Sequence, residues 1–415
     1  MVAPGRADSI GGPFFARYFS AVAVGAFGTA VTAVAVPVLV VDGFAADPFQ
    51  VGIVNAAQFV PYAVLGLFAG VYVDRWRRRP VLVWASIGRS ASLALIPVLW
   101  FAGVLQLWVL VVLLLLFGSF SVFGFAATQS LLPQLVDRRD LRLANGRLDQ
   151  AEAVAQTAGP ALGGALVALI GAPLAIAVDA LTYVIDAALI AGMKLTEPVR
   201  SRAAKRSLGG EIADGLRWGY RHRVLAPLAW STHVWFVANG AALTVLAVFA
   251  LRTLDFSAFI YGLLFAVGGV AALLGATAAA RAGERFGSGP TITAGRAVYP
   301  AAWTIIAAAS LVSLDVAVVL VFSGFALHGF AGGLENANEM SYRQSVTPDG
   351  LLGRVNGTMR SANRTLAAAG ALAGGASASL LGVVPTLLFV IVIFAAAFGI
   401  ALGSPVRTAR YDETS

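Results

Sequence analysis

The sequence contains no cysteine and only three histidines among its 415 residues. Disulfide bonds, thiolate metal sites and cysteine nucleophiles are therefore excluded, and the scattered histidines are too few for a metal cluster. Charged residues are also scarce, at 12% of the chain, whereas apolar residues reach 59% and the mean hydropathy is +0.82. A soluble domain of this length needs far more polar surface, and a disordered chain far more charge. The composition indicates a polytopic membrane protein.

Apolar runs long enough for a helix to cross a hydrocarbon core of about 30 Å recur along the chain. They predict an all-α integral membrane fold of twelve transmembrane helices, six on each side of one long polar stretch. The expected spans are 14–41, 51–73, 81–101, 107–132, 148–170, 173–193, 224–251, 260–280, 291–311, 316–333, 358–381 and 385–402. The polar first residues lack the apolar core of a cleaved signal peptide, so we expect the first span to remain a helix.

The polar stretch divides the chain into two six-helix bundles at 1–193 and 224–415, with a linker at 194–223. Leu208, Ile212, Leu216 and Tyr220 recur every fourth residue of this linker. This spacing fits a short amphipathic helix on the membrane surface, and it also fits a solvated tether with chance spacing.

The basic residues separate the two sides of the membrane. With twelve spans, all but three of the 29 lysines and arginines fall in the termini or in one alternate set of loops. The exceptions are Arg252 in the opposite set and Arg89 and Arg296 inside spans. Because basic loops stay on the cytoplasmic side, we expect both termini and the linker to be cytoplasmic, in a multi-pass protein of the inner (cytoplasmic) membrane.

The two halves match each other at a nearly constant offset, which indicates an internal duplication. Matches at 210 or 211 residues include Gly52 with Gly262, Asp74 with Glu284, Arg75 with Arg285, and the glycine-rich runs 159–164 and 370–375. Parallel six-helix repeats are one transporter architecture, and its binding site lies between the halves. We therefore expect two pseudo-symmetric bundles around a shared pocket.

A charged loop motif follows the second span and carries a family resemblance. Its residues are Gly70, Asp74, Arg75, Arg78 and Arg79, and Glu284 and Arg285 stand at the equivalent position of the second half. These residues resemble the signature G-x-x-x-D-R-x-G-R-R that the major facilitator superfamily carries between its second and third helices. Arg77 departs from the usual glycine. The resemblance implies a conformational latch between Asp74 and the start of the eleventh helix, near 356–359; simple anchoring of the loop by arginines is the alternative.

Further segments are similar to one branch of this superfamily, the proton-linked drug exporters that include macrolide-efflux and enterobactin-exporter proteins. They are 132–146, 179–183 in the sixth span, and 215–223 before the seventh. Gly159, Pro160, Gly163 and Gly164 resemble the fifth-helix motif of antiporters. A proline bend with glycine faces permits close sliding contact between helices, although ordinary small-residue packing gives the same pattern.

Ionisable groups inside spans are functional candidates, because an unpaired charge in a membrane is costly. Asp179 and Asp186 lie seven residues apart and therefore on one face of the sixth span, with Asp186 nearer mid-membrane. Either could carry a coupled proton; the alternatives are a structural pair with Arg89 or Arg296, or a hydrogen-bonded Asp179. His233 and His328 are further proton-coupling candidates, against the commoner case of a lone satisfied histidine.

Two pairs of opposite charges stand at helical spacing near the inner ends of the tenth and eleventh spans. Glu335 and Glu339 are four residues apart, as are Arg360 and Arg364. If the two helices face each other, these residues form either a cytoplasmic gate that breaks and remakes or a static anchor.

In the resembled superfamily the first, fourth, seventh and tenth helices line the cavity. The resemblance then implies a substrate wall that is mostly aromatic with a few polar groups: Phe27, Thr29, Phe117, Phe120, Phe123, Trp230, His233, Trp235, Asn239, Phe322, Phe325 and His328. Such a wall suits a bulky amphiphile, and each aromatic alone also fits core packing or lipid contact.

The sequence thus predicts a secondary transporter that exports a small hydrophobic or amphiphilic compound by alternating access, driven by a proton gradient. No cofactor, metal or nucleic acid is expected. ATP is not expected either, because neither lysine, Lys194 or Lys205, follows the glycine-rich pattern of a phosphate-binding loop. We expect a monomer whose partners are a small-molecule substrate and the lipid bilayer. The alternatives are an importer of the same fold, which a cavity rich in carboxylates or amides would favour, and a membrane-embedded enzyme or receptor.

Overall fold

The computed structural model of the protein describes residues 12–137, 139–193 and 216–410, and within these residues the chain is helical and contains no strand. The first-half helices are α1 (Pro13–Val38), α2 (Pro48–Ala57), α3 (Val60–Arg75), α4 (Arg78–Phe101), α5 (Leu107–Leu135), α6 (Leu141–Ile170) and α7 (Ala172–Ala191). The second-half helices are α9 (Leu225–Val248), α10 (Ala258–Phe286), α11 (Ser288–Ala308), α12 (Leu314–Val346), α13 (Asp349–Leu381) and α14 (Val383–Leu402). Short helical turns are η1 (Leu39–Gly43), η2 (Phe249–Thr253), η3 (Ala309–Leu311) and η4 (Pro405–Thr408).

These helices make the twelve predicted crossings. Ten segments within the described ranges are both long and apolar enough to span a membrane. The other two crossings are α11 and α13, which have 21 and 33 residues. At about 1.5 Å per residue both are long enough to cross, and they pack inside the bundle against α12, α14 and α9. The all-α membrane fold predicted from the sequence is confirmed.

The structure corrects the bounds of several predicted spans, including the fifth, which begins at Leu141, and the eighth, which ends at Phe286. The largest corrections concern three others. The second, expected as one helix over 51–73, is broken into α2 and α3 around Gln58 and Phe59. Pro61 lies in the first turn of α3, where its missing N–H breaks the ladder least. The tenth and eleventh helices, α12 and α13, extend 13 and nine residues beyond their apolar runs on the polar side. Hydropathy marks the membrane-embedded part of a helix and does not mark its end.

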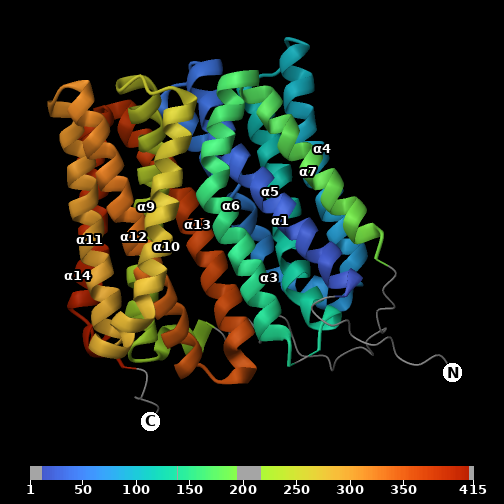
Figure 1. Ribbon diagram of the computed structural model, residues 1–415. Coiled ribbons are helices and arrows are strands. Elements are labelled where there is room, and N and C mark those ends of the chain that lie inside the picture. Colours follow the sequence, from blue (N-terminus) through green and yellow to red (C-terminus); the bar gives the residue numbers. More distant parts are fainter. Residues whose placement is uncertain (1–11, 138, 194–215, 411–415) are drawn as a thin grey trace.

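The helices stand side by side in two groups, the first half in blue to green and the second in yellow to red (Figure 1). The start of α1 and the turn η4 lie at the same end of the bundle, which we call the terminal end (Figure 1). The turns η1 and η2 lie at the opposite end, which we call the far end.

Each half repeats the same packing scheme, as the predicted duplication requires. In the first half α1 packs on α6 and α7, and α4 packs on α5 and α7. In the second half α9 packs on α13 and α14, and α11 packs on α12 and α14. The halves meet through two equivalent pairs, α2 with α13 and α6 with α10.

Local backbone geometry repeats too. The π-helical turns η1 and η2 begin 210 residues apart, and each is followed by a residue with positive φ, Ala45 at 48° and Asp255 at 53°. Gly171 and Gly382, 211 residues apart, each join two helices at φ of 84° and 93°. A residue with a Cβ is strained in this conformation, so glycine permits the direct reversal.

The apolar core is continuous across the two halves only towards the far end. One large cluster of buried side chains contains Val34 and Leu114 of the first half together with Val245 and Leu387 of the second. At the terminal end the halves have separate clusters, one around Tyr18 and Leu131, the other around Leu228 and Tyr342. The halves are therefore closed together at the far end.

Candidate functional site

A cavity of about 620 Å³ lies between the halves. Its lining on α6 runs from Pro160 in mid-helix down to Asn145 in the first turns, so it extends to the terminal end. Most of its wall belongs to α1, α5, α6 and α7 of the first half, and the second half contributes Phe265 and Arg364. Because the far end is closed by a common core, the cavity is accessible from the terminal end.

The wall of the cavity is built from regular helical faces. On α5 the lining residues Phe117, Ser121, Gly124, Phe125 and Thr128 recur at helical spacing. On α6 a polar face with the same spacing holds Asn145, Asp149, Glu152 and Gln156, and Gln156 donates to Glu152 at 3.1 Å. Both periodicities are visible in the sequence, and they could have identified these lining residues.

Among the twelve predicted wall residues, Thr29 and Phe117 line this cavity. Phe120 faces α4, where a Cβ built on Gly88 would collide with its ring, and Phe123 packs on the first-half cluster at the terminal end. Adjacent positions on a helix differ by about 100°, so a correct helix can still present the wrong aromatic. The remaining predicted residues also lie off this wall: Phe27, Trp230, His233, Trp235, Asn239, Phe322, Phe325 and His328.

In the second half two of the predicted aromatics, Trp235 and Phe325, belong to an internal cluster around His328, whereas Trp230 contacts Tyr220 and His233. Trp303 Nε1 donates to His328 Nδ1 at 3.1 Å, and the Phe325 ring stacks on the imidazole with centroids 5.5 Å apart. Trp235 stacks on the same imidazole at 6.3 Å. His328 is thus a packed and hydrogen-bonded histidine, as in the structural alternative.

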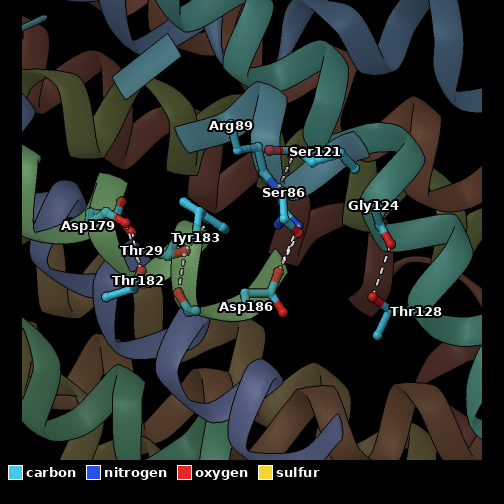
Figure 2. A network of polar contacts seen from close by, with 12 residues as sticks. Thr29, Ser86, Arg89, Ser121, Gly124, Thr128, Asp179, Thr182, Tyr183 and Asp186 are labelled. Carbon is cyan, nitrogen blue, oxygen red and sulfur yellow. Dashed lines mark hydrogen bonds and ion pairs between the residues drawn. The ribbon is translucent and has the colours of Figure 1, made fainter. Parts of the chain in front are cut away.

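The central polar cluster of the first half joins Arg89 of α4 to Asp186 of α7 (Figure 2). Arg89 Nη2 lies 3.6 Å from Asp186 Oδ2 and donates to Ser86 at 3.0 Å, while Ser86 donates to the same carboxylate oxygen. The guanidinium also lies 4.3 Å from the centroid of the Tyr183 ring, whose hydroxyl bonds Thr29 at 2.8 Å. Arg89, Asp186, Tyr183 and Thr29 all line the cavity.

Asp179 lies on the same helix but away from the cavity. It is fully buried, and Thr32 of α1 and Thr182 of α7 donate to its two carboxylate oxygens (Figure 2). A buried carboxylate held by two hydroxyl donors ties α7 to α1. Of the two aspartates singled out from the sequence, only Asp186 is in contact with the space a solute could occupy.

The second half contains a more deeply buried charge cluster. Arg296 of α11 is 1% exposed, and its guanidinium lies 3.2 Å from Glu335 and 3.1 Å from Glu339 of α12. Thr232 donates to Glu339 at 3.0 Å, and the Tyr299 hydroxyl donates to Glu335 at 3.0 Å. None of these residues is among those that line the described cavity.

This cluster corrects the predicted pairing of Glu335 and Glu339 with Arg360 and Arg364. The helical spacing was correct, but α12 packs on α10 and α11, so the carboxylates meet Arg296 instead. Arg360 and Arg364 reach across to first-half aromatic rings, 3.8 Å from the centroid of Phe125 and 5.3 Å from that of Phe59.

His233 connects the segment before α9 to α13. Its Nε2 is hydrogen-bonded to the Tyr220 hydroxyl, and its Nδ1 lies 2.7 Å from Asn363 Oδ1. Near this contact His222, outside the spans, accepts from the backbone N–H groups of Val224 and Leu225 at the start of α9. Burial lowers the pKa of His222, which favours the neutral ring that can accept these bonds.

The loop motif after α3 is described only in part. The surroundings of Gly70 and the side chains of Asp74 and Arg75 are outside what the structure describes, so the latch stays a prediction. Arg78 is buried, and Arg79 donates to the carbonyls of Ile190 and Ala191 at the end of α7. Cations favour the C-terminus of a helix, so Arg79 anchors the loop. The second-half echo, Glu284 and Arg285, is exposed, and Arg285 lies over Phe286 of its own helix.

The fifth-helix glycine motif has two packing roles. Cβ atoms built on Gly159 and Gly163 would lie 2.5 Å from Ala30 and 2.8 Å from Val31 of α1. One built on Gly164 would lie 2.5 Å from the Ala258 carbonyl oxygen and 3.2 Å from Gly262 Cα, on α10 of the other half. Pro160 is buried between these glycines and lines the cavity. The motif therefore fixes α6 to its own half and to the opposite one.

The duplicate motif on α13 does the same. Gly374 meets Ala241 of α9, whereas a Cβ on Gly375 would lie 2.6 Å from the Pro48 carbonyl oxygen and 3.0 Å from Gly52 Cα. Both copies therefore pack through small residues, and both lie at the contact between the halves.

Comparison with known proteins places this architecture in a family. The sequence profile of the Major Facilitator Superfamily matches residues 18–371. The chain belongs to this superfamily. It is therefore a membrane transporter and not an enzyme, and the resemblance drawn from the loop motif is confirmed.

Curated relatives cover only part of the chain. It is 32% identical over 226 residues to "Multidrug efflux pump Tap" of Mycobacterium tuberculosis, covering 52% of this chain and 53% of that protein. It is 31% identical over 228 residues to the pump of the same name from Mycolicibacterium fortuitum, covering 52% and 54%. The chain thus spans about half the length of the pumps it matches.

Solved structures share the fold at low sequence identity. The nucleoside transporter NupG superimposes with a TM-score of 0.69 at 13% identity, covering 94% of this chain and 98% of that one. A bacterial homologue of the human lysosomal transporter Spinster gives 0.70 at 14% identity, covering 94% and 95%. At such identities the likeness concerns the fold alone.

Proposed function

We propose that this superfamily member is a proton-coupled exporter of a small hydrophobic or amphiphilic compound, working by alternating access in the cytoplasmic membrane. The observation that carries the proposal is a cavity reached from the terminal end, with the Arg89–Asp186 ion pair in its wall. The names of the partly matching relatives, multidrug efflux pumps, support the direction and the substrate class.

The orientation rests on the arginines. The loops at the terminal end hold most of the basic residues, whereas Arg252 lies at the far end. Basic loops remain in the cytoplasm, so the terminal end faces the cytoplasm and the cavity is open to it. This is the side from which an exporter takes its substrate.

Asp186 is the proposed proton carrier. Its carboxylate is bound by Arg89 and Ser86, and it lines the cavity. Protonation of Asp186 would neutralise the carboxylate and cancel its attraction for Arg89. A substrate whose polar or cationic group binds the ionised Asp186 would then compete with the proton for one carboxylate, as an antiporter requires.

The aromatic part of the wall supports an amphiphilic substrate. Phe59, Tyr62, Phe117 and Phe125 offer apolar surface, and Thr29 and Gln129 offer polar contacts beside it. Ligand sites for such compounds are mostly apolar with a few placed polar groups.

Import of a polar solute is the second candidate, and one observation favours it. The α6 face of the cavity carries two carboxylates, Asp149 and Glu152, beside the amides of Asn145 and Gln156. The wall is therefore more polar than the sequence indicated, and the direction of transport must be measured.

The deciding experiment uses inverted membrane vesicles with an acidified interior and a fluorescent amphiphilic dye. We expect the dye to accumulate inside, and a protonophore to abolish the accumulation. The variant Asp186→Asn should reduce gradient-driven accumulation at least about tenfold, because it removes the titrating group and leaves Arg89 without its charge partner. Asp137→Asn, which removes a carboxylate from an exposed pair with Arg139, should transport as the native chain does.

Three results would contradict the proposal. Accumulation that survives the protonophore would remove proton coupling, and accumulation only in right-side-out vesicles would favour the importer. Normal gradient-driven transport by Asp186→Asn would mean that another group carries the proton.

A further inference from the structure

Arg252 is exceptional among the basic residues of the chain. Among the residues that the structure describes, the other arginines lie in the terminal-end loops, near the ends of the described chain or inside helices, whereas Arg252 lies in η2 at the far end. The rule that keeps basic residues on the cytoplasmic side disfavours an arginine here. An arginine at this end is therefore expected to make a specific stabilising contact.

The contact crosses from the second half to the first. Arg252 Nη2 donates to the carbonyl oxygen of Val41 at 3.0 Å and to that of Ala46 at 2.9 Å. Both acceptors belong to the turn that links α1 to α2, which includes η1 and the left-handed Ala45. One guanidinium nitrogen thus bridges two points of the opposing turn.

The duplication explains why only the second-half turn donates in this contact. Arg252 stands 210 residues after Asp42, so the two equivalent turns carry opposite charges at the same position. Asp42 lies within electrostatic range of Arg252, but the guanidinium's hydrogen bonds are to the backbone. The carbonyls provide the directional contact, and Asp42 adds long-range attraction.

The rest of the far-end seam is nearly apolar. The glycine contacts of α2 with α13 and of α6 with α10 involve backbone and small side chains. Beside them, Asn55 of α2 donates to Thr244 of α9 at 3.2 Å. If the halves separate here, the two Arg252 bonds must break together, because both acceptors lie on one turn.

We propose that Arg252 is the lock of the far end, a side chain that holds the cavity closed on that side by binding the Val41 and Ala46 carbonyls. This inference rests on the alternating access of the proposed function. The lock sets the balance between the two states of the transporter and does not touch the substrate or the proton site.

The test measures accessibility without substrate or gradient. The chain contains no cysteine, so a single reporter can be introduced without other changes. Ala56→Cys places a thiol in the buried contact of α2 with Ala368 and Ala371 of α13, and Ala26→Cys places one in the cavity wall. Adding Arg252→Met, which keeps length and removes the donors, should speed thiol labelling of the Ala56→Cys reporter about fivefold and slow that of the Ala26→Cys reporter.

Two further variants separate the possible causes. Arg252→Lys retains a cation that can donate to both carbonyls and should label within about twofold of the native background. Asp42→Asn removes the charge but not the acceptors, and it should have less effect than Arg252→Met. Arg252 is exposed, so its replacement leaves no buried void.

Unchanged labelling of both reporters in Arg252→Met would overturn the proposal. An equal effect of Asp42→Asn would replace the carbonyl lock by simple charge attraction and would overturn it as well. Because labelling needs no transported compound, these results stand even if the dye experiment fails; failure of dye transport with the expected labelling would count against the proposed function alone.

Discussion

Replacing Arg296 by methionine is expected to lower the free energy of unfolding by about 3–5 kcal/mol, because removing one partner of a buried ion pair leaves uncompensated charge. Here the change would leave both Glu335 and Glu339, which are 5% and 8% exposed, without the guanidinium between them. Thr232 would still donate a hydrogen bond to Glu339, and Tyr299 one to Glu335. Arg343 would remain 3.6 Å from Glu339, but Glu335 would have only the neutral Tyr299 hydroxyl to balance its charge.

The measurement is unfolding of the purified protein in mixed micelles, followed by tryptophan fluorescence. Arg285→Met, at an exposed arginine of α10, is the matched control and should unfold as the native chain does. The triple variant Arg296→Met, Glu335→Gln, Glu339→Gln should recover most of the loss, because it removes the unpaired carboxylates. If the single variant Arg296→Met has the native free energy of unfolding, the carboxylates of the cluster are hydrated or already neutral.

Comparison with the first half sharpens this expectation. Arg89 also pairs with a carboxylate, but its side chain is 16% exposed and lines the cavity, whereas that of Arg296 is 1% exposed. Arg89→Met should therefore destabilise the protein less than Arg296→Met and impair transport more. Of the two equivalent third helices, α4 would then contribute mainly to transport through Arg89, and α11 mainly to stability through Arg296.

Gly52→Ala is expected to reduce transport about tenfold or more while leaving a folded protein. The added Cβ would lie 2.6 Å from the Ala371 carbonyl oxygen and 3.1 Å from Gly375 Cα, both backbone atoms of the opposite half. Such contacts force the helices apart, and overpacking of this kind costs about 1–3 kcal/mol. Since the strain exists only when the far end is closed, it disfavours the state with the cavity open to the terminal end.

The duplication provides an internal test of this reasoning. Gly164→Ala places a Cβ 2.5 Å from the Ala258 carbonyl oxygen, across the equivalent seam between α6 and α10, and should act in the same direction. Gly399→Ala on α14 is the control, because a Cβ there meets nothing within 4 Å. Dye transport and labelling of the Ala26→Cys reporter measure the effect. If Gly52→Ala and Gly399→Ala transport equally well, the contact between the halves is looser than its geometry indicates.

The architecture could be predicted from the sequence because it depends on patterns that many residues share. Apolar runs of membrane length, segregated arginines and matches at 210 or 211 residues each survive errors at single positions. They predicted twelve crossings and a duplicated chain. The polar extensions of α12 and α13 were missed because hydropathy does not report on a helix that continues beyond the membrane.

The site was harder to predict from the sequence, because it depends on which helices pack against each other. Spacing placed Glu335 and Glu339 correctly on one face, but only the packing of α12 on α11 selects Arg296 as their partner. For Asp186 the sequence left two arginines open, and the packing of α4 on α7 selects Arg89. Most of the predicted lining residues of the cavity were wrong for a similar reason. Knowing which helices line the cavity in the family does not fix how each helix is rotated about its own axis.

The apolar core that both halves share towards the far end also has a thermal consequence. Opening that end would bring side chains such as Val34 and Val245, each no more than 1% exposed, into contact with water. Hydration of apolar surface raises the heat capacity, and the stabilisation gained by burying it weakens on cooling. Unless an equal apolar area becomes buried at the terminal end, low temperature should populate the opposite state of the empty carrier.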